Sequence, residues 1–314
     1  MPVQRITPLP PPEAAEPKRA ETKRNDTMLG IALMAGGMFL FSAVDAHGKF
    51  LSQTLHPIQI TWCRQMGLVL GVVIMLCLRG FSILHTKQPG LQITRGALAA
   101  GSATLFIFAV SYVPLADAVA VSFVAPFFVT LLGALVLREK VGIRRWAAVI
   151  IGFVGTLIVI RPGLDAVHPA VFLVLIAALL FASRQIISRM LAGTDRTITT
   201  IAYTALASIA ILSLPLPFVW EWPATGTEIT LLITMALLAA CAESLVIKAL
   251  EVAQAVVVAP LQYSLIIWGT MYGFFVFGDL PDVWTGVGAL IIVATGIYTL
   301  RREQLAARKR QQIN

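Results

Sequence analysis

The chain carries little charge for its length. Only 13% of its 314 residues are Asp, Glu, Lys or Arg, whereas soluble domains carry about a quarter. Hydrophobic residues make up 58% of the chain, and the mean hydropathy is +0.83. This composition excludes an ordinary soluble domain and predicts that most of the chain lies in a lipid bilayer.

Cysteine and histidine are also scarce. The three cysteines lie inside apolar stretches without C-x-x-C spacing, and the chain has four histidines. We therefore expect no disulfide, no metal site and no cofactor. The sequence contains no G-x-x-x-x-G-K-[ST] motif, which disfavours an ATP-driven machine. It also contains no H-E-x-x-H or G-x-S-x-G motif, which disfavours the competing class, a membrane-embedded enzyme.

What the chain does contain is a series of apolar stretches of helix length. Each is too long for a strand and lacks the alternation of a membrane barrel. A helix needs about 20 such residues to cross the hydrocarbon core. The sequence therefore predicts an all-α membrane protein with ten transmembrane helices, at 29–51, 57–78, 95–112, 115–137, 144–161, 169–190, 198–219, 229–250, 254–277 and 283–301.

The basic residues favour one orientation in the membrane. Lys and Arg gather in the tails and the even-numbered connections, whereas the odd-numbered connections contain acids and, apart from Arg161 at one border, no Lys or Arg. The positive-inside rule then places both termini of this multi-pass cell (inner) membrane protein in the cytoplasm. We expect a disordered cytoplasmic tail over 1–27 and a basic one over 303–314. Because the net charge of +8 collects at helix ends and tails, we expect membrane lipid and no nucleic acid as a partner.

The second half of the chain repeats the first. At one constant offset along the chain, Glu139 falls on Asp279 within similar apolar surroundings. Five spans per half is an odd number, so the second copy must enter the bilayer from the opposite side. Many secondary transporters are built in this way, with the solute at the repeat interface. We expect two inverted five-helix repeats, over 28–162 and 163–302.

Two segments carry a family likeness. They are "SYVPLADAVAVSFVAPFFVTLLGALVLREKVGIRRWAAVIIGFVGTLIVIRPG" and "LEVAQAVVVAPLQYSLIIWGTMYGFFVFGDLPDVWTGVGALIIVATGIYTLRRE". Each combines a small-residue turn into a span, a mid-span Ala-Pro, an acidic residue at the span's end and a Gly-spaced span. The pattern resembles EamA-type proteins of the drug/metabolite transporter superfamily, over about residues 28–302. The resemblance implies a ten-helix inverted repeat that moves small organic metabolites by alternating access.

The resemblance leaves the solute and the direction of transport open. The stretches "VDAHGKFL" and "HPIQITWCRQ" are most similar to the bacterial subset with riboflavin and S-adenosylmethionine uptake proteins. We expect a secondary transporter of a small-molecule solute, with riboflavin or a similar planar metabolite as the first candidate. Export of amino-acid-like or other metabolites is the alternative, and a homodimer is an open option for the assembly.

Ionised side chains inside a span are costly and indicate function. Asp45 and Lys49 are four residues apart on one helix face, so they can pair locally or contribute to a gate. Arg64, beside Gln65, lies about 10 Å inside its span at 1.5 Å per residue. It needs a carboxylate, for which Asp45 is the candidate, or an anionic group of the solute.

Glu243 is the acid of most interest, because it has no basic residue at i±3 or i±4. A desolvated carboxylate suits reversible proton binding, so we expect Glu243 to couple transport to protons. The alternative is an ion pair with Arg184 or another basic residue across the bundle. Arg184 is itself a candidate for the solute cavity.

Two prolines fall within predicted spans. Pro126 and Pro260 each free a backbone carbonyl one turn earlier, so we expect hinges there, with a passive kink as the alternative. Beside the second proline lie an amide, a phenol and an indole, from Gln262, Tyr263 and Trp268. Such groups can stack on and hydrogen-bond a flat aromatic solute. Packing or interface anchoring is the competing interpretation for each of the three.

Overall fold

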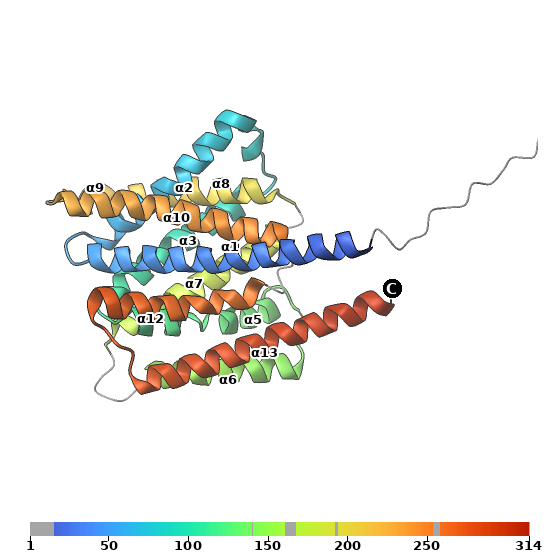
Figure 1. Ribbon diagram of the computed structural model, residues 1–314. Helices are drawn as coiled ribbons and strands as arrows, with labels where there is room; N and C mark the ends of the chain where they lie inside the picture. The colour runs from blue at the N-terminus through green and yellow to red at the C-terminus, as the bar shows by residue number, and fades with distance from the viewer. Residues whose placement is uncertain (1–15, 140, 161–167, 192–193, 254–257, 314) are drawn as a thin grey trace, which may run out of the picture.

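The computed structural model describes residues 16–139, 141–160, 168–191, 194–253 and 258–313 as a bundle of helices (Figure 1). All regular structure in these residues is helical. The elements are α1 (Glu16–Leu51), α2 (Pro57–Arg79), the 3₁₀ helix η2 (Phe81–Leu84), α3 (Pro89–Val110), α4 (Leu115–Ser122), α5 (Ala125–Leu135), α6 (Ile143–Ile160), α7 (Ala170–Leu191), α8 (Thr197–Ser213), α9 (Leu216–Val219), α10 (Gly226–Val252), the 3₁₀ helix η3 (Ala259–Tyr263), α12 (Ser264–Phe277) and α13 (Val283–Ile313).

These helices account for the apolar stretches of the sequence. Within the described residues, six helices are long and apolar enough to cross a membrane, namely Asp26–Leu51, Pro57–Arg79, Pro89–Val110, Leu115–Leu135, Ala170–Leu191 and Gly226–Val252. Three shorter apolar helices are Trp146–Ile160, Thr197–Ser213 and Val283–Thr299. The remaining predicted span, 254–277, begins outside the described residues and continues as η3 and α12.

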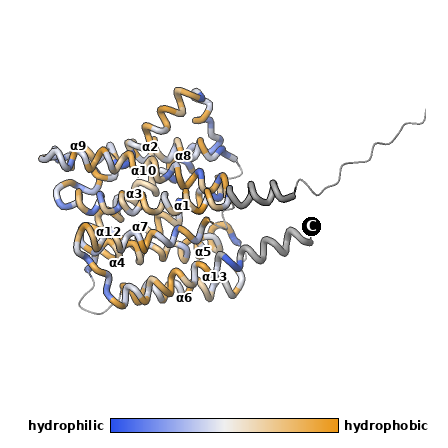
Figure 2. The backbone as a smooth tube through the Cα atoms, viewed as in Figure 1, coloured by the Kyte–Doolittle hydropathy of each residue, from blue (hydrophilic) through white to orange (hydrophobic). Residues whose placement is uncertain are grey.

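The outside of the bundle is apolar. Leu78, Phe275 and Leu290 are each more than 70% exposed, which in water would be an aggregation hazard. Figure 2 shows hydrophobic residues along the length of the helices and hydrophilic ones mainly near helix ends. Lipid is the surrounding that such a surface requires, so the chain is a multi-pass membrane protein.

The expected tails are partly helical. The first part of the tail expected over 1–27 lies outside the described residues, but α1 already begins at Glu16. At the other end, α13 continues through the basic tail expected over 303–314 and ends at Ile313. The disorder expected in the N-terminal tail stays a prediction for residues 1–15, which lie outside the described part of the chain. The stretch from Glu16 onward is rich in Glu, Ala, Lys and Arg, which are good helix formers, so the helix of the first span extends outward.

Two predicted spans are interrupted at their prolines. α4 ends at Ser122, and Pro126 lies in the first turn of the following α5. Pro260 lies in the first turn of η3, which precedes α12. Proline has no N–H to donate and clashes with the preceding turn, so the helix restarts there. Both prolines thus stand at junctions between helical segments, while their movement as hinges stays a prediction.

Helix boundaries recur at the offset that aligns Glu139 with Asp279. At this offset the end of α7 matches the end of α1, and the starts of α8 and α13 match the starts of α2 and α6. Contacts recur reciprocally: α1 packs against α10 and α12, while α7 packs against α3 and α5. Likewise α2 packs against α10 and α8 against α3. Each half therefore completes the packing of the other; the predicted repeat boundary, at 162 and 163, lies outside the described residues.

The same turn follows α5 and α12. Arg138 and Gly278 have left-handed φ angles of 53° and 72°. The next residues, Glu139 and Asp279, each donate their backbone N–H to the glycine carbonyl six residues earlier, at 3.2 and 3.0 Å. A left-handed residue just after the last turn is a common way for a helix to end. The two acids aligned by the repeat thus occupy the same local geometry.

Candidate functional site

Five ionised side chains from five helices form one group in the bundle. We call them the central charge group; each is partly buried. Its members are Asp45 on α1, Arg64 on α2, Arg95 on α3, Arg184 on α7 and Glu243 on α10. The group therefore draws its members from both halves of the chain.

Opposite charges in this group face each other through space. The charge of Arg64 acts on Asp45, and the charge of Glu243 acts on Arg184. The sequence predicts Asp45 as the partner of Arg64, and their pairing stays a prediction. The side chains of Asp45, Arg64 and Glu243 make no hydrogen bond or ion pair with another described residue. The charges are thus close enough to attract but are not in direct contact.

Close helix packing brings part of this group together. A Cβ at Gly67 would collide with the Ala236 carbonyl of α10, so only glycine lets α2 approach α10 this closely. Arg64 and the buried Gln65 lie within one turn of this contact. Glu243 lies about two turns further along α10 at 3.6 residues per turn. The glycine therefore fixes the relation between two members of the charge group.

Arg184 has an unsatisfied donor. Its guanidinium stands 4.8 Å from the ring centroid of Phe181 on the same helix. Its Nε is buried and has no hydrogen-bond partner among the described residues. Buried N–H groups usually have a partner, so this donor is available to a solute or to water. The alternative expected for Arg184 was an ion pair with Glu243. The two charges attract each other across the bundle, but no ion pair is formed between them.

Arg95 is the member that the sequence analysis missed. We expected it in a cytoplasmic connection, because the predicted span began there. The helix instead begins at Pro89, which is a frequent first residue of helices, so Arg95 lies well inside α3. Its guanidinium donates to the Ser188 hydroxyl at 2.8 Å, to the Thr200 carbonyl at 3.3 Å and to the Thr204 hydroxyl. It also interacts electrostatically with the arginine on α7 and the acid on α10.

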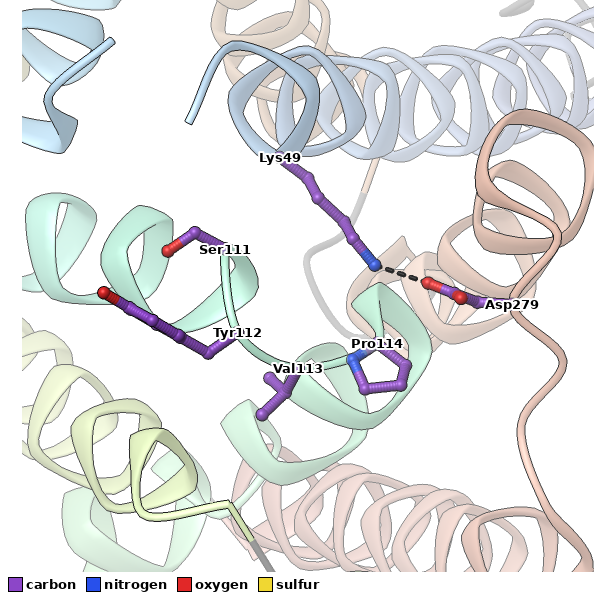
Figure 3. Close-up of a pocket in the computed structure, with 6 residues that line it drawn as sticks. All are labelled: Lys49, Ser111, Tyr112, Val113, Pro114 and Asp279. Carbon is purple, nitrogen blue, oxygen red and sulfur yellow. Dashed lines mark hydrogen bonds and ion pairs between the residues drawn. The ribbon is translucent and has the colours of Figure 1, made fainter. Parts of the chain in front are cut away.

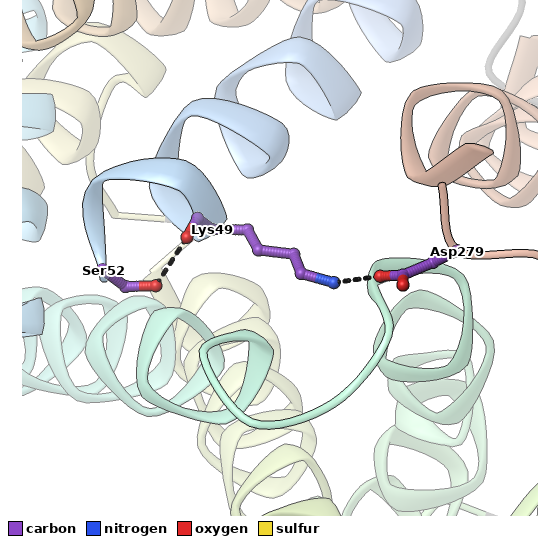
Figure 4. Close-up of polar contacts among 3 residues, drawn as sticks. All are labelled: Lys49, Ser52 and Asp279. Carbon is purple, nitrogen blue, oxygen red and sulfur yellow. Dashed lines mark hydrogen bonds and ion pairs between the residues drawn. The ribbon is translucent and has the colours of Figure 1, made fainter. Parts of the chain in front are cut away.

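Lys49 pairs with a distant acid. Its Nζ lies 2.5 Å from Oδ2 of Asp279 and 4.7 Å from the ring centroid of Phe277. Figure 4 shows this side chain reaching from α1 to the turn after α12. The expected local pair with Asp45 is therefore corrected: the long lysine side chain reaches the other half of the protein, and Asp45 faces Arg64.

A small cavity surrounds this ion pair (Figure 3). Its volume is about 220 Å³, below the roughly 300–1,000 Å³ of ordinary ligand pockets. It is lined by Lys49, Ser111, Tyr112, Val113, Pro114 and Asp279. The cavity can hold water around the ion pair but is small for a whole metabolite, so it is not the binding site for one.

A second ion pair joins α7 to the turn after α5. The Nη1 atom of Arg189 lies 3.1 Å from Oε1 and 3.2 Å from Oε2 of Glu139. Nearby along the chain, Asp195 accepts hydrogen bonds from Thr86 at 2.5 Å and from Gln92 at 2.7 Å. These bonds hold the pKa of the Asp195 carboxyl below its usual range. They link the connection after α2 to the connection after α7.

The expected aromatic group does not converge on one surface. Gln262 is exposed. Tyr263 stacks on Phe123 at 5.0 Å and packs against α13. Trp268 meets Phe39 of α1 edge to face at 5.2 Å, and its buried indole N–H has no acceptor among the described residues. Of the three, only Trp268 offers an unused buried donor to a solute.

Known proteins are similar to most of the chain. A family model described as the EamA-like transporter family matches residues 28–161. A relative from Rickettsia felis named an S-adenosylmethionine uptake transporter is 25% identical over 88% of this chain and 95% of its own length. A riboflavin transporter of Vibrio cholerae is 32% identical over 73% of this chain and 78% of its own length. A pseudopaline exporter of Pseudomonas aeruginosa is 25% identical over 88% of this chain and 97% of its own length.

Proposed function

Because the chain belongs to the EamA-like transporter family, we propose that it moves a small organic metabolite across the cell (inner) membrane by alternating access. It is a membrane transporter and not an enzyme. It crosses the bilayer ten times, as two inverted five-helix repeats with both termini in the cytoplasm. The recurring helix boundaries, the reciprocal packing of the halves and the matched turns at Glu139 and Asp279 support this arrangement.

The solute binds at the central charge group. The observation that carries this proposal is that partly buried charges of both signs, drawn from both halves, gather in one place, while Asp45, Arg64 and Glu243 make no ion pair with another described residue. A buried charge without compensation costs several kcal/mol, so water or a solute must complete the contacts. Arg64 and Arg184 then bind anionic or carbonyl groups of the solute, and Asp45 and Glu243 bind donors.

Riboflavin or a similar planar metabolite is the first solute to test. Its support is the Vibrio cholerae relative, which is named a riboflavin transporter, since Gln262, Tyr263 and Trp268 do not form a common stacking surface. A charged, amino-acid-like solute such as S-adenosylmethionine is the second candidate. The central charge group favours it, because guanidinium and carboxylate groups bind a solute that carries both signs of charge.

The solute and the direction of transport can be tested together. We expect cells that contain the protein to gain or lose one class of metabolite relative to cells without it, measured by untargeted comparison of cells and medium. Both directions must be measured, because the relatives include an exporter. An unchanged flavin pool would exclude riboflavin, and an unchanged S-adenosylmethionine pool would exclude the second candidate. A protein with Arg64→Ala is the matched control.

The topology makes a separate prediction. A tag inserted at Gly226 should be reached from outside the cell. Tags at His85, at Gly142 or at the C-terminus should be reached only after the membrane is permeabilised. A cytoplasmic signal from Gly226 would contradict the inverted repeat, because an even number of spans would then separate it from His85.

A further inference from the structure

Two ion pairs join the halves of the protein. Lys49 at the end of α1 binds Asp279 after α12, and Arg189 at the end of α7 binds Glu139 after α5. The offset that aligns Glu139 with Asp279 also aligns Lys49 with Arg189. Each residue of one pair is therefore the repeat counterpart of a residue of the other. A further ion pair joins Lys248 to Glu251 within one helix.

The two pairs have the same construction at opposite ends of the bundle. In each, the base comes from the last turn of a long helix and the acid follows a left-handed residue. The ends of α1 and α7 lie at opposite ends of the bundle, and the C-terminus lies at the end where α7 finishes (Figure 1). Each pair ties a base of one half to an acid of the other, so neither can persist if the halves separate at that face.

We propose that these pairs are matched gates: Lys49–Asp279 closes the external face and Glu139–Arg189 closes the cytoplasmic face. This inference rests on the proposed transport cycle. When one pair breaks and the other stays formed, the bundle opens at one face only. Because the two halves are inverted copies, breaking the other pair instead opens the opposite face, and the two halves exchange roles. In this structure both pairs are formed.

The exposure of the pairs predicts their relative strength. The side chains of Lys49 and Asp279 are 12% and 34% exposed, whereas those of Arg189 and Glu139 are 42% and 38% exposed. Solvent-exposed pairs shift an equilibrium by at most about five-fold, which a transport cycle can overcome by thermal motion. The external pair is the less exposed, so its loss should have the larger effect.

A reporter cysteine can measure which face opens. Ser42 is buried on α1, its hydroxyl has no partner among the described residues, and it shares a helix face with Asp45 and Lys49. In a background without the native cysteines, Ser42→Cys changes the side chain little. A membrane-impermeant thiol reagent is then added to one or the other side of oriented vesicles. The measurement needs no solute.

Neutral variants should open one face each. We expect Asp279→Asn to raise the rate of labelling from the external side about five-fold, and Glu139→Gln to raise it from the cytoplasmic side about two-fold. The double variant Lys49→Asp, Asp279→Lys swaps the two charges and should restore the labelling rate of the protein with the native pair. Glu251→Gln, which disrupts a pair within one helix, is the matched control and should change neither rate.

Two outcomes would overturn the gates. One is that Asp279→Asn and Glu139→Gln both increase labelling from the same side, or that each increases it from both sides. The pairs would then only stabilise the fold. The other is no change in either variant. Side-specific labelling in a protein that moves no metabolite would instead keep the gates and contradict the proposed transport function.

Discussion

Replacing Arg64 with alanine is expected to abolish transport while the protein still inserts in the membrane. Arg64 is partly buried, and its charge compensates Asp45. Without this guanidinium the Asp45 carboxylate loses its compensating charge and the solute loses the contact proposed for Arg64, at a cost of several kcal/mol, so transport should fall by about 100-fold or more. Lysine should rescue poorly, because it lacks the planar donor fork of arginine.

Uptake into proteoliposomes, normalised to inserted protein, measures this effect. Arg79→Ala is the matched control, since Arg79 is an exposed basic residue at the end of the same helix. Transport by Arg64→Ala at the wild-type rate would show that Arg64 takes no part in binding. A variant that fails to insert would be replaced by Arg64→Gln, which keeps the length and polarity of the side chain.

Replacing Glu243 with glutamine should preserve exchange of labelled for unlabelled solute but remove uphill accumulation. Glu243 has no partner on its own helix, as expected, but it faces Arg184 and Arg95 across the bundle. This alters the original reason for expecting proton coupling, which supposed an isolated acid.

The proton gradient sets how far the solute can be concentrated. One pH unit is equivalent to about 1.4 kcal/mol, so a wild-type protein coupled to one proton should concentrate solute about ten-fold per pH unit. Glu251→Gln alters an exposed acid on the same helix and should leave accumulation intact. Accumulation by wild type after an ionophore has collapsed the proton gradient would exclude this coupling, and facilitated diffusion or exchange would replace it.

The sequence predicts the helices well because their signal is local. Apolar length specifies a span, and the constant offset between the halves reveals the internal repeat without any knowledge of packing. Prolines mark where spans break for the same reason: the missing N–H acts on its own turn. Arg95 shows the limit of hydropathy, since the helix start at Pro89 lay outside the most apolar stretch.

Pairing between side chains depends on tertiary structure and was harder to predict. Lys49 could reach Asp45 one turn away or Asp279 in the other half, and only the packing of α1 against α12 decides between them. The repeat did contain the missing signal, because Lys49 aligns with Arg189 at the same offset that aligns the two acids. The side chains of Gln262 and Tyr263 point in different directions for a local reason, since a 3₁₀ helix turns about 120° per residue.

The turns that carry the two acids differ in one respect that bears on the resting orientation of the protein. Gly278 adopts its left-handed conformation freely, whereas Arg138 adopts the same conformation at a cost of about 1–2 kcal/mol. The turn after α5 is therefore the less stable of the two, although the ion pairs beside them are built alike. A duplicated architecture of this kind gives two related states without making them equally populated. If the two pairs gate opposite faces as proposed, the imbalance favours an inward-facing molecule in the absence of solute.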